Sequence, residues 1–319
     1  MKKFLQKLMA SMMIFILVLS FTGCDKNEED SSVEESEEVE ETEQNQEDTN
    51  TDEDDTDEVS QDQRVVAGTV AVSYILDALD YENVVGLPES TYSMPERYNE
   101  ATNIGTPMKP DAEIVKSLEP DLFISVSSLE ESNKPAMDNL GIESLFINLS
   151  DYDNILQSVK EIAEVLNLPS EGDKVVASIE EEANDAIAKA EGLESPKVLF
   201  IFGTPKSVMV GNEDSYVGSL MKMLQINNIA ADAPEEYTPL SLENIVEENP
   251  DIVLVMNHVN PEESKKMMQA EFDRNPAWSN MKAYQNDKII YLDNDIYSVT
   301  GNIRVGEALE KLVEMVYEK

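Results

Sequence analysis

Two side chains of metal-binding type, His258 and Met108, each occupy an unusual place in the sequence. His258 is the only histidine in 319 residues, and it follows an apolar run, Ile252–Met256, by two positions. Met108 is flanked by prolines in Gly105-Thr106-Pro107-Met108-Lys109-Pro110, which predicts a stiff, extended and exposed loop. A lone histidine is usually structural or merely exposed, and methionine usually fills gaps in a core. Spacing alone therefore leaves a ligand role and a structural role open for both.

Motifs of the common enzyme classes are missing from the sequence. There is no Gly-x-Ser-x-Gly, no P-loop and no Gly-x-Gly-x-x-Gly, and no nucleophile lies at a recognisable spacing from His258. The sequence therefore predicts a protein that is not an enzyme. A zinc- or manganese-binding protein is also disfavoured, because such sites use several histidines and this chain has one.

Residues 1–23 have the pattern of a signal peptide. Lysines precede an apolar run, Leu8–Phe21, which is too short for a comfortable membrane span. The run ends in Phe21-Thr22-Gly23-Cys24, which contains the only cysteine of the chain. This ending resembles a bacterial lipobox, although Phe21 stands where Leu is usual. The resemblance implies that Cys24 is lipidated and anchors an extracytoplasmic protein to the cell membrane, at a Gram-positive surface.

Residues 24–62 are predicted to be the lipidated cysteine and a disordered acidic tether. From Asp25 to Asp62 there are 20 Asp and Glu against one Lys, and three valines are the only apolar residues. Such a segment cannot bury enough apolar surface to fold. The net charge of the whole chain is −43, and the remainder after the tether is also acidic. Nucleic acid is therefore excluded as a partner, because it calls for basic patches.

From residue 63 onward, short apolar runs alternate with helical patterns, which predicts an α/β fold with mainly parallel sheets. Between Pro169 and Gly192, apolar residues at helical spacing predict an amphipathic helix of about 22 residues, ~33 Å long. The predicted strands are Val65–Ala67, Asn83–Gly86, Leu122–Ser125, Glu143–Ile147, Lys197–Phe202, Ile252–Met256 and Lys288–Tyr291.

An internal repeat lies on either side of the long helix. Glu113 begins a short helical pattern that ends in Pro120-Asp121 before a buried strand, and Glu243 begins the same pattern before Pro250-Asp251. We therefore predict two Rossmann-like lobes, residues 63–168 and 193–319. A single long helix, residues 169–192, joins them, and the ligand cleft lies between them.

This body resembles the extracytoplasmic binding proteins of ABC importers for iron-siderophores, cobalamin and heme, in which a long helix joins two lobes and limits their closure. In that family the helix-start glutamate of each lobe docks with basic residues of the permease, which implies such a role for Glu113 and Glu243. Each glutamate would in any case stabilise its helix through the helix dipole, by a few tenths of a kcal/mol, on the order of 0.3.

The resemblance is more specific to the heme-binding lipoproteins of iron-regulated surface uptake systems. The segments that carry it are Arg64–Val72, Arg97–Asp111 and Asn257–Pro261. In that family a methionine of the first lobe and a histidine of the second are the axial ligands of heme iron, and they match Met108 and His258. The pair fills both axial positions and leaves no open site for catalysis. The resemblance thus implies heme as the transported ligand, an ABC importer permease as partner, and heme-donor surface proteins upstream.

The same resemblance places the heme propionates near two turns. One is the turn around Thr69 and Val70, and the other is Ser90-Thr91-Tyr92, where the loop keeps its length but changes its residues. Helix N-termini expose N–H groups that suit carboxylates. The Asp293–Gly301 loop, with Tyr297, is a further candidate for lining the cleft, with no role assigned to it.

Alternatives remain on the same fold and outside it. An iron-siderophore would favour a cleft with Arg or Lys clusters, and cobalamin an aromatic-lined one, whereas this body is acidic and Trp278 is its only tryptophan. Another heme-like tetrapyrrole also stays open. A purely structural or adhesive surface protein would show no stabilisation by a ligand.

Overall fold

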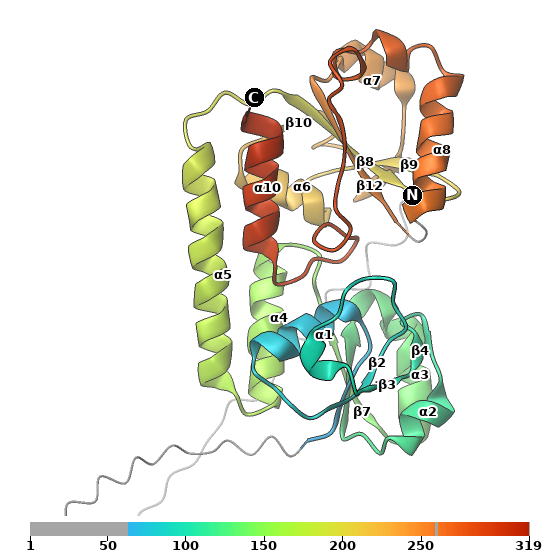
Figure 1. The fold of residues 1–319 in the computed structure, drawn as a ribbon, viewed down its shortest axis with the longest axis vertical. Coiled ribbons are helices and arrows are strands. Elements are labelled where there is room, and N and C mark those ends of the chain that lie inside the picture. The colour runs from blue at the N-terminus through green and yellow to red at the C-terminus, as the bar shows by residue number, and fades with distance from the viewer. Residues whose placement is uncertain (1–62, 259–260, 319) are drawn as a thin grey trace, which may run out of the picture. The chain divides into compact units, whose positions relative to one another are not determined.

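Two α/β lobes and the long helix α5 (Pro169–Ala190) make up the described part of the chain (Figure 1). The computed structural model describes residues 63–258 and 261–318, which fall within one structural unit, Asp57–Lys319. The predicted signal peptide, Cys24 and the acidic tether lie outside the described residues. Within them, no helix is long and apolar enough to cross a membrane. The predicted fold class is confirmed.

The first lobe is built on a five-stranded parallel sheet in the order β3-β2-β1-β6-β7. The strands are β1 (Val65–Ala67), β2 (Val84–Leu87), β3 (Thr102–Asn103), β6 (Leu122–Val126) and β7 (Glu143–Ile147). Its helices are α1 (Val70–Ala78), α2 (Ala112–Ser117), α3 (Glu130–Leu140) and α4 (Tyr152–Val165), with 3-10 turns at Glu96–Tyr98 and Ser127–Leu129. Every residue of β1 and β6 is buried, as expected for central strands covered on both faces.

A two-stranded antiparallel hairpin, β4 (Gly105–Thr106) and β5 (Lys109–Pro110), follows β3. Gly105 pairs with Pro110 and Thr106 with Lys109, so that Pro107 and Met108 form the turn between them. Gly105 has a φ of 89°, a conformation that suits glycine because it has no Cβ. The segment predicted as an extended loop is therefore a hairpin with Met108 at its tip.

The second lobe contains a six-stranded mixed sheet in the order β11-β9-β8-β12-β13, with β10 paired to the start of β8. The strands are β8 (Lys197–Gly203), β9 (Val208–Gly211), β10 (Asn227–Asn228), β11 (Tyr237–Pro239), β12 (Ile252–Asn257) and β13 (Ile289–Tyr291). Its helices are α6 (Tyr216–Met223), α7 (Leu242–Glu248), α8 (Pro261–Arg274), α9 (Lys282–Gln285) and α10 (Val305–Tyr317), with a 3-10 turn at Trp278–Asn280. Strands β9 and β11 are antiparallel to their neighbours, and the other pairs are parallel.

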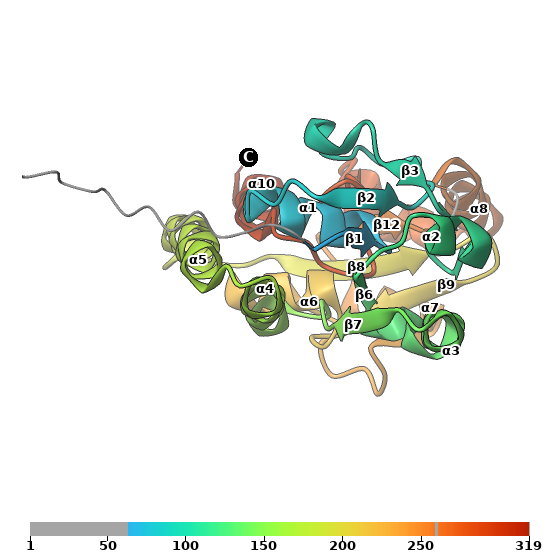
Figure 2. The ribbon, with the colours of Figure 1, turned by 90° about the horizontal axis from the view of Figure 1, so that it is seen from below.

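The long helix α5 packs against a helix of each lobe. Its buried face, which includes Val176, Ile179 and Ala183, is the one predicted from the sequence. It contacts α4 and α10, and Figures 1 and 2 show it running beside both. At Gly172 a Cβ would come within 2.5 Å of the Cβ of Ala163, so the absence of a side chain lets α5 approach α4 closely.

Candidate functional site

The predicted ligand-binding residues of the first lobe follow three neighbouring strands. Thr69 follows β1, Ser90 comes after β2, and the Met108 hairpin comes after β3. These strands are parallel neighbours, so their carboxyl ends lie at one edge of the sheet, where α/β proteins bind ligands. A backbone hydrogen bond joins two of the loops, because the N–H of Glu89 donates to the carbonyl of Gly105 at 2.7 Å. The structure therefore brings these sequence-predicted residues to the same edge.

Helix α1 begins at this edge. Thr69 is its N-cap, and its Oγ1 accepts a hydrogen bond from the N–H of Val72 at 3.4 Å. The Tyr74 hydroxyl, one turn into the helix, donates to the carbonyl of Ser93 at 3.3 Å and so ties the second loop to α1. This contact links the helix that begins after Thr69 to the loop that contains Ser90–Tyr92.

The Ser90–Tyr92 turn is partly ordered by its own side chains. Ser90 Oγ accepts from the N–H of Tyr92 at 2.9 Å. Burial raises the pKa of the Tyr92 hydroxyl, and the nearby Asp295 carboxylate raises it further. Ser93 Oγ also donates to Asp295 Oδ2 at 3.3 Å, which connects this loop to a loop of the second lobe.

Tyr297 does not present its hydroxyl to a ligand. Its side chain is 1% exposed, and the hydroxyl donates to the carbonyl of Ala308 at 2.6 Å. Within the Asp293–Gly301 loop, Asp295 and Gly301 reach the first lobe instead: Asp295 accepts from Ser93, and the N–H of Gly301 donates to the carbonyl of Leu149 at 2.8 Å. Tyr297 is a core residue that packs the loop against α10.

Met108 is the most exposed large apolar side chain of the described residues. It is 73% exposed, against 50% for Leu193, the next in order. A methionine that filled a core gap would be buried, so the exposure removes that reading of Met108. The position at the tip of a hairpin leaves its thioether free to reach a ligand.

His258 lies directly after β12, at the carboxyl end of that strand. Its backbone is held on both sides: its N–H donates to the carbonyl of Gly203 at 2.8 Å, and its carbonyl accepts from Ser264 Oγ at 2.8 Å. Its ring lies 5.6 Å from that of Phe202, which in turn lies 4.5 Å from the ring of Tyr237. Burial lowers the pKa of the imidazole, which favours the neutral form that binds metals.

Glu113 and Glu243 occupy equivalent places in the two lobes. Each is an exposed residue in the first turn of a short helix, α2 or α7. The Asp111 side chain caps α2 by accepting from the N–H groups of Glu113 and Ile114. The internal repeat is therefore a structural repeat, and it leaves both glutamates available to a partner.

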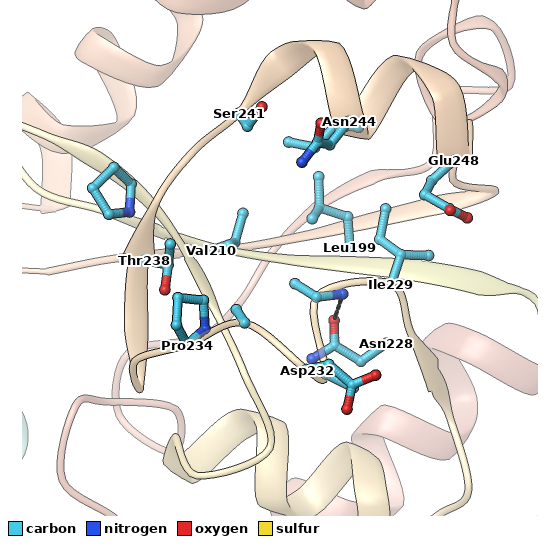
Figure 3. Close-up of a pocket in the computed structure, with 15 residues that line it drawn as sticks. Leu199, Val210, Asn228, Ile229, Asp232, Pro234, Thr238, Ser241, Asn244 and Glu248 are labelled. Carbon is cyan, nitrogen blue, oxygen red and sulfur yellow. Dashed lines mark hydrogen bonds between the residues drawn. The ribbon is translucent and has the colours of Figure 1, made fainter.

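A separate pocket of about 390 Å³ lies within the second lobe (Figure 3). It is lined by α7, β11 and the 228–234 segment, with an apolar floor that includes Leu199 and Val210. Asn228 is used internally, because its Oδ1 accepts from the N–H of Ala230 and its Nδ2 donates to the carbonyl of Gly211, both at 3.0 Å. Neither Met108 nor His258 lines this pocket, so it is distinct from the predicted site.

Sequence reasoning missed the residues that support the two candidate ligands. Asn133 Nδ2 donates to the carbonyl of Pro107 at 3.0 Å, next to Met108, while Ser264 and Phe202 contact His258. Ser264 is the fourth residue of α8 and not at a capping position, and its hydroxyl donates to the carbonyl of His258, so no capping pattern indicates it from the sequence. Nothing local in the sequence indicates Asn133, because its partner lies on another element.

Comparisons with known proteins identify the family. The pattern of the periplasmic binding protein family matches residues 65–296. The high-affinity heme uptake system protein IsdE of Staphylococcus aureus is 31% identical over 262 residues, which cover 81% of this chain and 89% of that protein. The crystal structure of S. aureus IsdE complexed with heme has a TM-score of 0.74 at 31% identity, and covers 80% of this chain and 99% of that one. An ABC transporter substrate-binding protein from Listeria monocytogenes EGD-e gives 0.73 at 30% identity, with 81% and 99% covered.

The chain belongs to the periplasmic binding protein family. It is therefore an extracytoplasmic substrate-binding protein of an ABC transporter, with a permease as its partner, and not an enzyme. The family predicted from the sequence is confirmed.

The depressed pKa of His258 can be tested directly in the heme-free protein. Because it is the only histidine, its imidazole resonances need no assignment in an NMR titration. We expect a midpoint below the ordinary value of 6.5, since burial disfavours the charged ring. At pH values below about 6.5 the unfolded chain then binds more protons at this site than the folded chain does. The free energy of unfolding therefore decreases as the pH is lowered below about 6.5, and this histidine does not change it at higher pH.

The control is His258→Asn, whose stability is measured by urea unfolding at a series of pH values. The variant should lose the decrease in stability that is linked to the histidine. It should keep the decrease at lower pH that is caused by carboxylates. A native midpoint at or above 6.5 would show that the ring is not desolvated.

Proposed function

We propose that this chain captures heme, with Met108 and His258 as the axial ligands of the iron, and delivers it to a membrane permease. The observation that carries the proposal is the pairing of an exposed thioether on one lobe with a half-buried, neutral imidazole on the other. Each lies at the carboxyl edge of its own sheet. The similarity to IsdE, a heme uptake protein, supports heme as the cargo.

The proposed ligands suit opposite faces of a flat, apolar molecule. Four porphyrin nitrogens surround the iron, and a thioether and an imidazole complete six coordination, which leaves no position for catalysis. The Phe202 and Tyr237 rings beside His258 supply an apolar wall on that side. In this proposal the cleft lies between lobes of residues 63–168 and 193–319, joined by the helix region 169–192.

The heme propionates are proposed to lie near Thr69, Val70, Ser90, Thr91 and Tyr92. The first-turn N–H groups of α1 are natural donors to carboxylates. Tyr92 adds a hydroxyl that is protonated at physiological pH, and its raised pKa extends the protonated form to higher pH. These donors are neutral, so they bind an anion without needing a basic side chain.

Cys24 is proposed to carry the lipid that anchors the protein, with residues 24–62 as the tether. The pattern Phe21-Thr22-Gly23-Cys24 and the acidic composition that follows support this assignment. Heme would reach the protein from donor proteins at the cell surface. Glu113 and Glu243 are proposed to dock with basic residues of the permease.

Heme ligation is tested by adding ferric heme to the full chain and to Met108→Ala and His258→Ala, with absorption spectroscopy as the readout. We expect a saturable low-spin, six-coordinate spectrum that each substitution shifts, because each removes one axial ligand. Met315→Ala, on α10, is the control for loss of a methionine elsewhere and should match the native spectrum.

Absence of saturable heme binding, or a spectrum unchanged in both ligand variants, would overturn the proposal. Iron-siderophores and cobalamin would then be the next ligands to test on the same protein.

Docking is tested with Glu113→Ala and Glu243→Ala in reconstituted vesicles that contain the permease and its ATPase. Both variants should bind heme as the native protein does, while transport falls, since each removes a carboxylate that would pair with a basic residue. Glu119→Ala and Glu247→Ala remove exposed carboxylates beyond the end of α2 and in the last turn of α7, and serve as matched controls. Equal transport by all four variants would exclude the docking role.

A further inference from the structure

The hairpin that carries Met108 is too small to hold its own conformation. Its two strands contain two residues each, and isolated hairpins are marginal in water even when they are longer. Pro110 pairs opposite Gly105 but has no N–H to donate. The base of the hairpin is fixed by the N–H of Asp111, which donates to the carbonyl of Ile104 at 2.6 Å. The turn at the other end needs a different support.

Asn133 supplies that support from helix α3. Its Nδ2 donates to the carbonyl of Pro107 at 3.0 Å, and this carbonyl belongs to the peptide unit that begins Met108. The side chain of Asn133 is 1% exposed. In the sequence it lies 26 positions away from Pro107, so the contact depends on the packing of α3 against the hairpin. The bond therefore joins the tip of an exposed hairpin to the interior of the lobe.

The choice of residue at position 133 has a cost that this bond offsets. Asparagine is a poor residue for a helix interior, because its amide competes for backbone hydrogen bonds. A buried amide is also unfavourable unless it is hydrogen-bonded. An apolar residue would fill the same place on α3 without either penalty, and Met137, one turn later on the same helix, is fully buried in that way.

We propose that Asn133 is a positioning residue for Met108, which holds the Pro107–Met108 turn in its ligand-presenting conformation before heme arrives. The inference rests on the proposed function, in which Met108 is an axial ligand. Without the bond, the turn would have to be ordered on binding, and that loss of chain freedom would weaken the complex. A net hydrogen bond of ordinary strength corresponds to roughly a two- to tenfold change in affinity.

The test uses the full chain with Asn133→Leu, which keeps the branch at Cγ and removes the donor, and Asn133→Ala, which removes the donor without adding volume, as a second variant. In the heme-free protein, amide hydrogen exchange across residues 105–109 should be faster than in the native chain. With ferric heme, the dissociation constant should rise about two- to tenfold, and the signature of methionine ligation should weaken. Met137→Ala is the control, because it destabilises the same helix and leaves the amide in place.

A double-mutant cycle with Met108→Ala separates positioning from general stability. If Asn133 acts through Met108, Asn133→Leu should cause no further loss of heme affinity once Met108 is alanine. Equal losses in both backgrounds, native-like binding by both Asn133 variants, or a Met137→Ala variant that loses the methionine signature equally, would each overturn the inference. If Met108→Ala itself leaves the heme spectrum unchanged, the proposed ligand is wrong, which is a separate and recognisable failure.

Discussion

The parallel pairing of strands in each lobe is the constraint on which the candidate site depends. In the first sheet β1 and β6 are fully buried, so a shift of pairing by one residue would place every side chain of the strand against different neighbours in a core that is packed on both faces. Every connection between parallel neighbours must cross back over the sheet, and the loops after the strands collect at one edge. This is how Thr69, Ser90 and Met108, from distant parts of the sequence, come to the same edge. His258 reaches the corresponding edge of the second sheet for the same reason.

The charge of the protein raises an electrostatic question for an anionic ligand. The chain carries a net charge of −43, yet heme has two propionate groups. Exposed charges farther away than a Debye length, about 8 Å at physiological ionic strength, are largely screened. The N–H groups at the start of α1 and the Tyr92 hydroxyl would act at contact distance, where screening is weak. Groups at short range therefore decide whether a carboxylate binds: these donors favour it, and the Asp295 carboxylate beside Tyr92 opposes it. The acidic surface favours basic partners elsewhere on the molecule.

The sequence was sufficient for the main elements of the fold and insufficient for the supports of the site. All seven predicted strands are present, with ends within one residue of the prediction, because buried parallel strands are runs of apolar residues. Strands such as β3, β4 and β10 have two residues each and are too short to show any periodicity. The antiparallel β9 and β11 were also missed, since their place beside β8 is set by long-range pairing.

The candidate residues show the same difference between what a local pattern specifies and what long-range packing decides. Glu113 and Glu243 could be placed on their helices from the Pro-Asp repeat, because a local pattern specifies a local structure. The exposure of Met108 followed from its prolines in the same way. The contact of Asn133 with Pro107, and the burial of Tyr297 against Ala308, depend on how separate elements pack. No pattern within either segment contains that information.

The central claim is that one ligand from each lobe binds the same iron. The most direct measurement is a crystal structure of the protein crystallised with ferric heme. The account predicts iron bonded to the Met108 sulfur on one face of the porphyrin and to an imidazole nitrogen of His258 on the other. Heme bound through any other pair of side chains, or bound in the pocket of the second lobe, would contradict it.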